Sequence, residues 1–111
     1  MKAMIKMKNN ELNRSIWEIN DKELLNLIVG RDGGKTTIRI IDKILTKPYN
    51  KNQLAKALKL DYNTITHHIN IITNHEYILK LKFENTFYYH PSDKLIKSLD
   101  EYNLIRKYLK K

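Results

Sequence analysis

The sequence of 111 residues contains no cysteine, three glycines and two prolines. The absence of cysteine excludes disulfide bonds, thiolate metal sites and cysteine catalysis, and it is compatible with a reducing compartment, so we expect a cytoplasmic protein. No apolar run approaches the ~20 residues that a membrane-spanning helix needs, and the N-terminus lacks the uninterrupted apolar segment of a signal peptide. The sequence therefore predicts one small domain with no membrane partner.

Groups that could carry catalysis or bind a metal ion are also few. The histidines are His67, His68, His75 and His90. Neighbouring side chains on a helix point about 100° apart, so His67 and His68 are poorly placed to share one ion. The carboxylates are scattered along the chain, and no serine lies in a nucleophile-elbow pattern. We therefore expect no metal, no cofactor and no enzymatic activity.

Charge is the clearest signal in the composition. Lysine and arginine number 21 against 12 aspartates and glutamates, which gives a net charge of +9 and a pI near 9.7. A basic balance of this size fits a polyanionic partner such as nucleic acid. A lysine-rich protein that is only soluble has the same balance, so charge alone does not decide between them.

Residues 50–61 predict a short helix followed by a tight turn. Asn50 and Gln53 have the spacing of a capping box. Leu54, Ala55 and Leu58 then form one apolar stripe. A turn of sequence Lys-Leu-Asp follows at residues 59–61, with Leu60 expected to point inward and Asp61 expected to cap the next helix.

Residues 62–72 predict a second helix with two different faces. Ile65, Ile69 and Ile72 recur at i, i+4 and i+7, so they share one buried face. The opposite face is short, uncharged and able to form hydrogen bonds, which suits the base edges of a DNA major groove. The candidate base-reading residues on this face are Asn63, Thr66, His67 and Asn70.

The stretch at residues 54–69 resembles the helix-turn-helix of winged-helix transcription regulators, and it is most similar to archaeal members of the arsenical-resistance-repressor (ArsR) type. The resemblance extends over residues 33–91, about half of the chain. In that pattern Ala55 is the small residue of the first helix and Leu60 is the anchor of the turn. The pattern usually has glycine where this sequence has Lys59. Because lysine adopts a positive φ only at a cost, we expect an altered or strained turn there.

Residues 77–90 predict a β-hairpin, which the resemblance identifies as the wing. Tyr77, Leu79, Leu81 and Phe83 alternate with Ile78, Lys80 and Lys82, which is the period of a half-buried strand whose lysines face outward. The turn at residues 84–86 is acidic or neutral, which weakens the case for insertion into a minor groove. The candidate phosphate-contacting residues are Lys51, Lys56, Lys59, Tyr62, Thr64, Lys80 and Lys82.

Two further helices are expected before the helix-turn-helix. A short helix at residues 20–29 begins with the capping pair Asn20 and Glu23 and ends at Gly30. A second helix at residues 37–46 begins at a cap on Thr36 or Thr37. The link between them, Gly33-Gly-Lys-Thr36, is similar to the end of a phosphate-binding P-loop, but the spacing fails because position 29 is valine.

The two ends of the chain complete the expected organisation. Residues 1–15 form an N-terminal arm, residues 16–91 the winged domain and residues 92–111 a C-terminal helix capped by Ser92. That helix is apolar nearly all round in its second half, so it needs two covers: its own domain, which could include the Trp17 segment, and a second chain. ArsR-like proteins commonly dimerise through terminal helices. The candidate dimer-interface residues are Trp17, Leu95, Leu99, Tyr102, Leu104, Ile105, Tyr108 and Leu109.

The whole sequence predicts a mainly α fold with a small β-hairpin wing (α+β), namely a winged helix-turn-helix with extra N-terminal and C-terminal helices. The predicted function is a homodimeric, sequence-specific transcription regulator that binds double-stranded DNA, with its recognition helix in the major groove and its wing near the phosphate backbone. Three alternatives remain open: a protein-interaction or dimerisation module, a non-specific chromatin-type DNA binder, and a nucleotide-binding protein built on residues 33–36.

Overall fold

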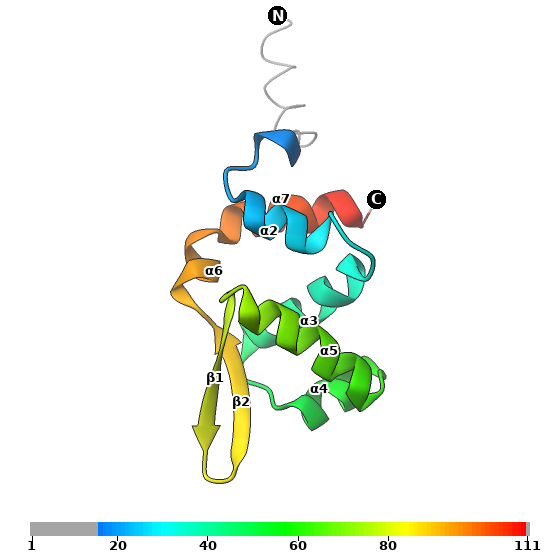
Figure 1. The fold of residues 1–111 in the computed structure, drawn as a ribbon, viewed down its shortest axis with the longest axis vertical. Coiled ribbons are helices and arrows are strands. Elements are labelled where there is room, and N and C mark those ends of the chain that lie inside the picture. Colours follow the sequence, from blue (N-terminus) through cyan, green and yellow to red (C-terminus); the bar gives the residue numbers. More distant parts are fainter. Residues whose placement is uncertain (1–15, 111) are drawn as a thin grey trace, which may run out of the picture.

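The computed structural model describes residues 16–110, so the predicted arm at residues 1–15 lies outside the described residues. The described chain is mainly helical and carries one antiparallel two-stranded hairpin, which confirms the predicted fold class (Figure 1). In chain order the elements are η1 (Ile16–Glu18, a 3₁₀ helix), α2 (Lys22–Ile28), α3 (Gly34–Thr46), α4 (Lys51–Leu58), α5 (Tyr62–Asn74), β1 (Ile78–Phe83), β2 (Thr86–Pro91), α6 (Asp93–Lys97) and α7 (Leu99–Leu109).

The helices form two groups with α3 between them. Helices α2 and α7 lie beside each other near η1, while α4, α5 and the hairpin lie at the opposite end (Figure 1). Buried isoleucines from α3 and α5 dominate the core that joins the groups, including Ile41, Ile44, Ile65 and Ile69. The predicted inward face of α5 is therefore confirmed, and burial of these apolar side chains is the main stabilising term for such short helices.

Local capping signals fix most helix starts. The capping box of Asn50 and Gln53 is present in both directions, at 2.8 and 2.9 Å. Asp61 caps α5 by accepting a hydrogen bond of 2.7 Å from the backbone N–H of Thr64. Ser92 caps α6 through the N–H of Leu95. These side chains satisfy donors that would otherwise lack partners at helix N-termini.

The start of α2 differs from the prediction by one residue. Asp21, and not Asn20, is the cap, and its carboxylate accepts from the N–H of Leu24 at 3.0 Å. The backbone N–H groups of Asn20 and Asp21 instead donate to Glu101 of α7, at 2.8 and 2.9 Å. A carboxylate 80 residues away in the chain thus takes the place that the predicted pair gave to Glu23.

The glycine pair before α3 is explained by packing. The helix begins at Gly34 and not at Thr37, and Gly33 precedes it with a φ of 85°, a conformation that favours glycine. A Cβ atom on Gly34 would lie 1.9 Å from the backbone oxygen of Ile28, so no larger residue fits where α3 passes the end of α2. Thr37, the predicted cap, is buried inside the helix.

The turn of the helix-turn-helix contains a lysine with a positive φ, a backbone conformation that is costly for most residues other than glycine. Lys59 adopts φ 57° and ψ 45°, in the left-handed region where glycine is usual, so the expected strain is confirmed. The carbonyl oxygen of Leu58 accepts a hydrogen bond of 2.7 Å from Nη2 of Arg39. Leu60 is partly buried and packs on the core as expected. These contacts hold the turn in place.

The single C-terminal helix of the prediction is two helices, α6 and α7, which meet at Ser98. The Ser98 hydroxyl donates to the carboxylate of Asp21 at 2.6 Å. The backbone N–H of Ser98 donates to the carbonyl of Leu95 at 3.0 Å, which closes α6 with a tight turn. The chain therefore changes direction where the apolar periodicity alone indicates a continuous helix.

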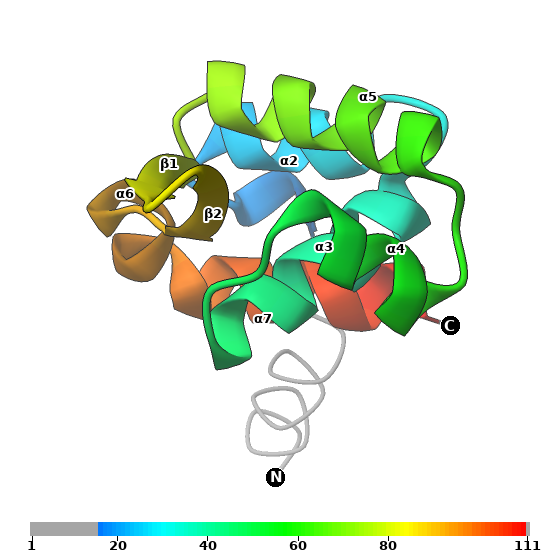
Figure 2. The same cartoon turned by 90° about the horizontal axis from the view of Figure 1, so that it is seen from below.

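The wing is present, and Tyr77 just before it is buried as predicted, but the prediction that Leu79, Leu81 and Phe83 are also buried was wrong. Strand β1 pairs with β2 from Ile78 opposite Pro91 to Phe83 opposite Thr86. Ile78 is buried, while Leu79, Leu81 and Phe83 are 45%, 55% and 63% exposed. The hairpin extends past the helices (Figure 1), and in the end-on view of Figure 2 it lies at the edge of the body. The outer side chains of β1 are therefore left exposed. Alternation therefore distinguishes two faces of the strand without showing which one meets the body.

Candidate nucleic-acid interface

Helix α5 presents an uncharged polar face to solvent. Asn63, His67 and Asn70 are all exposed there, as the sequence predicts. Thr66 differs, because its hydroxyl oxygen is buried and has no hydrogen-bond partner among the described residues. It therefore offers no oxygen to a ligand in this arrangement. The remaining three side chains can all donate and accept hydrogen bonds, which is what reading a base edge requires.

The other side of α5 is held by a buried histidine. His68 is 7% exposed, and its Nδ1 lies 3.3 Å from the hydroxyl of Thr37 on α3. The same hydroxyl accepts a hydrogen bond of 3.2 Å from Nη1 of Arg31. Burial lowers the pKa of His68, and the charges of Arg31 and His67 add to the effect. A neutral imidazole thus links the candidate recognition helix to the interior.

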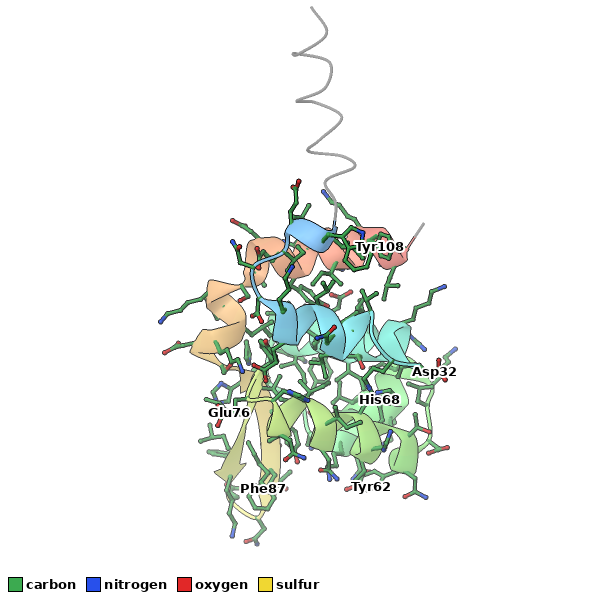
Figure 3. All side chains as sticks on the ribbon, turned by 45° about the horizontal axis from the view of Figure 1, so that its top comes forward. Asp32, Tyr62, His68, Glu76, Phe87 and Tyr108 are labelled. Carbon is green, nitrogen blue, oxygen red and sulfur yellow. The ribbon has the colours of Figure 1, made fainter. Side chains whose placement is uncertain are left out.

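A cleft of about 300 Å³ separates the helix-turn-helix from the wing. Its lining comes from the starts of α4 and α5 and from β2 with the turn before it. The lining residues are Asn50, Lys51, Asn52, Tyr62, Asn85, Thr86, Phe87 and Tyr89. Most of them offer amides, hydroxyls or aromatic edges. Figure 3 shows Tyr62 and Phe87 at the same end of the molecule.

Three of the predicted phosphate contacts are cations close to this cleft. Lys51 Nζ lies 5.8 Å from the ring centroid of Tyr62. On the wing, Nζ of Lys80 and Nζ of Lys82 lie 4.6 and 5.9 Å from the ring centroid of Phe87. Their approach to aromatic faces is a favourable cation–π arrangement that restrains long side chains. The cleft thus has positive charge on both of its sides.

The other predicted phosphate contacts lie outside the lining of the cleft. Lys56 and Lys59 are exposed on α4 and in the turn that follows it. Thr64 is partly buried, and its backbone N–H donates to the carboxylate of Asp61. The structure therefore brings Lys51, Tyr62, Lys80 and Lys82 together and leaves these three residues along the helix-turn-helix.

The candidate dimer residues divide into three groups by their exposure. Leu95, Tyr102 and Ile105 are completely buried in the core of the chain itself, so in this arrangement their side chains present no surface to a second chain. Leu99, Leu104 and Leu109 are partly buried against the same core. Trp17 and Tyr108 are 77% and 49% exposed. The inward stripe of the last helices is thus already covered within one chain.

A partly buried polar network explains the placement of Tyr102. Its hydroxyl donates to Oδ1 of Asp42 at 2.7 Å, and Nε of Arg106 donates to both oxygens of the same carboxylate, at 3.0 and 2.9 Å. Burial raises the pKa of Tyr102, and the hydrogen bond to Asp42 raises it further. These contacts fasten α7 to α3. No local sequence signal marks them, because each joins residues at least 60 positions apart.

A second set of polar contacts surrounds the end of α5. Glu23 accepts hydrogen bonds from Nζ of Lys94 at 2.7 Å and from the His75 ring at 2.8 Å. These hydrogen bonds, that of Lys94 first, lower the pKa of Glu23. Burial alone would raise the pKa of nearby Asp21, but hydrogen bonds from Ser98, Tyr77 and a backbone N–H reverse the direction. The sequence marks Glu23 only as a capping residue, paired with Asn20, and it does not single out Asp21.

In residues 16–110, no group of three histidine, cysteine, aspartate or glutamate side chains gathers in a way that could hold a metal ion. Within the same range, no helix combines the length and the apolar character needed to cross a membrane.

Comparison with known proteins identifies the fold of this chain. No protein-family model matches the sequence, and no curated protein matches it. Among solved structures, reduced HlyU from Vibrio cholerae is 16% identical, with a TM-score of 0.57 over 85% of this chain and 87% of HlyU. NolR from Sinorhizobium fredii is 17% identical, with a TM-score of 0.58 over 84% of this chain and 94% of NolR. The likeness to these two structures establishes that this chain has the winged helix-turn-helix fold.

Proposed function

We propose that this chain is a sequence-specific DNA-binding transcription regulator that places α5 in the major groove. The observation that carries the proposal is the position of an uncharged polar helix face directly beside a cleft with cations on both sides. Asn63 and Asn70 have the side-chain amide that pairs with two atoms of adenine, and His67 adds a further donor or acceptor. These three residues would distinguish one DNA sequence from another.

The cleft suits the phosphate backbone that borders the major groove. Lys51 approaches it from α4, while Lys80 and Lys82 approach from the wing. Contacts of lysine with phosphate add affinity and fix the register of the protein without reading sequence. We include Lys56, Lys59, Tyr62 and Thr64 as further backbone contacts. The net charge of the whole chain, +9, also favours a negatively charged partner such as DNA.

We further propose that two copies bind one inverted repeat. Trp17 and Tyr108 are exposed at the end of the molecule opposite the wing, and Leu99, Leu104 and Leu109 are partly exposed on α7. A homodimer formed through this end would leave both wings free. Its two α5 helices would then read half-sites one DNA turn apart, about 34–36 Å.

The test is binding of the purified protein to a labelled duplex from its own upstream region, with a scrambled duplex beside it, over about 50–300 mM salt. For 6–10 phosphate contacts, affinity should fall by roughly 10³–10⁵ between ~50 and ~200 mM salt. The native duplex should bind more tightly than the scrambled one at every salt concentration. Weak, equal binding to both duplexes would contradict sequence reading and leave a basic surface only.

A further inference from the structure

One face of the wing is apolar and open to solvent. Leu79, Leu81 and Phe83 alternate along β1 on the side away from the lysines, and the half-buried Tyr88 stands opposite Leu81 on β2. The other β2 residues of this face, Thr86 and His90, are polar. We call Leu79, Leu81, Phe83 and Tyr88 the outer wing face. Large apolar side chains gathered on a projecting hairpin are unusual on a small protein, and such patches commonly mark an interaction site.

Phe83 is the most prominent member of the outer wing face. It is the last residue of β1, next to the turn, and it is 63% exposed. Its ring packs edge-on against Tyr88, with 6.5 Å between the centroids and 68° between the planes. This contact restrains the ring, so an aromatic side chain is held at the tip of the wing instead of folding back onto the body.

The opposite side of the same hairpin is cationic. Lys80 pairs with Tyr89 and Lys82 with Phe87, so these four side chains share the inner wing face, beside the cleft. In a complex with α5 in the major groove, the inner face would lie over the phosphate backbone that borders the groove. The outer wing face would then lie beyond that backbone, on the side of the minor groove. The positions of both wing faces follow from the same placement of the protein on DNA, and neither requires movement of the wing.

We propose that the wing enters the minor groove and that Phe83 inserts between two stacked base pairs, which kinks the duplex. This inference rests on the proposed function and adds DNA bending to it. Apolar side chains inserted from the minor groove partly unstack a base step and bend DNA toward the major groove. Pyrimidine–purine steps such as TA unstack most easily, so the wing would favour such a step without a hydrogen bond to any base.

The size of the outer wing face favours this occupant over a second protein chain. A stable protein interface buries about 800 Å² on each partner and involves roughly 20–30 residues. The outer wing face consists of four residues on a hairpin with six-residue strands. A wedge between base pairs needs one or two apolar side chains with cations near them. The wing has Phe83 and, on its other face, Lys80 and Lys82, while the turn next to Phe83 carries the acidic Glu84.

The experiment uses a duplex from the chain's own upstream region with a donor and an acceptor dye at its ends. Fluorescence anisotropy reports binding, and energy transfer between the dyes reports bending in the same titration. Phe83→Ala is compared with Ile96→Ala, a matched control because Ile96 is 49% exposed on α6. Both side chains are exposed, so neither variant should unfold.

The wild-type protein and Ile96→Ala should both raise energy transfer on binding. Phe83→Ala should still bind, about tenfold more weakly, and give little or no rise. It should also fail to brighten 2-aminopurine placed at the TA step, a fluorescent base that reports unstacking. Bound wild-type protein without a rise, or an unchanged rise with Phe83→Ala, would overturn the wedge and leave the proposed function standing. Absence of DNA binding would overturn both, and a Phe83-dependent dimer in sedimentation would assign the face to a second copy.

Discussion

The Nδ1 atom of His68 lies 3.3 Å from the hydroxyl oxygen of Thr37, and this contact joins the candidate recognition helix to α3. Arg31 donates to the same hydroxyl at 3.2 Å and to the carbonyl of Leu27 at 3.1 Å. Figure 3 shows His68 between α5 and the region of α2. A polar contact on the buried side of α5 therefore helps to orient its exposed face. A change in the charge of His68 would affect both this contact and the orientation of that face.

We expect the protein to lose stability as the pH falls through the range below about 6.5. Burial first, and then the charges of Arg31 and His67, lower the pKa of His68 from its ordinary value of 6.5. The unfolded chain therefore binds a proton at this side chain more readily than the folded chain, so the free energy of unfolding rises with pH in this window. The midpoint of urea denaturation should be lower at about pH 5.5 than at about pH 7.5.

His68→Gln should reduce that pH dependence because it removes the group that titrates. His90→Gln is the control, since His90 lies on the wing and contacts neither Thr37 nor Arg31 among the described residues. It should keep the wild-type difference between the two pH values. An equally large difference in His68→Gln would show that the pH dependence arises elsewhere.

Gly34→Ala should destabilise the fold by roughly 2–3 kcal/mol. The added Cβ would meet the backbone oxygen of Ile28 at 1.9 Å, and a backbone atom cannot move aside as a flexible side chain can. Helices α2 and α3 would have to separate. Thr36→Ala, in the same turn of α3, removes a partly exposed side chain and should change the stability by less than about 0.5 kcal/mol. Urea denaturation measures both; equal stabilities of the two variants would contradict the contact.

Local signals account for the parts of the fold that the sequence predicted. The capping box at Asn50, the cap at Asp61 and the isoleucine spacing of α5 all act within one or two turns. They place the helix-turn-helix and its polar face correctly because neither depends on distant residues. The positive φ of Lys59 was likewise foreseen from one substitution in a known pattern.

The remaining features depend on contacts between distant parts of the chain. Which side of β1 is exposed depends on how far the helices extend along the hairpin. The alternation of residues along a strand gives no information about that. The break at Ser98 accompanies its hydrogen bond to Asp21, 77 positions away. Tyr102 has the apolar spacing of an interface residue, but Asp42 and Arg106 hold it in the core. Sequence periodicity therefore located the buried face of α7 without showing what covers it.

Asn70→Ala should reduce discrimination between DNA sequences. A good two-point contact with a base is worth about 1–3 kcal/mol, so binding to the native duplex should weaken by roughly 5- to 150-fold. Binding to the scrambled duplex should change little, since no charge is removed. Asn26→Ala, at an exposed asparagine of α2, is the control and should leave both affinities unchanged. Equal weakening on the two duplexes would refute base reading by Asn70.

Lys82→Ala should weaken binding to native and scrambled duplexes equally. Lys82 lies on the inner wing face, with Nζ 5.9 Å from the ring centroid of Phe87, and it faces away from Leu81 and Phe83. Its loss removes one phosphate contact, so the slope of log affinity against log salt should become shallower by about 0.9. Lys107→Ala removes an exposed charge on α7, at the end opposite the wing, and should keep the wild-type slope. An unchanged slope in Lys82→Ala would show that Lys82 on the wing does not contact the phosphate backbone.

Because Phe83→Ala removes no charge, it should keep the wild-type slope, so the two variants separate the cationic face of the wing from its apolar face.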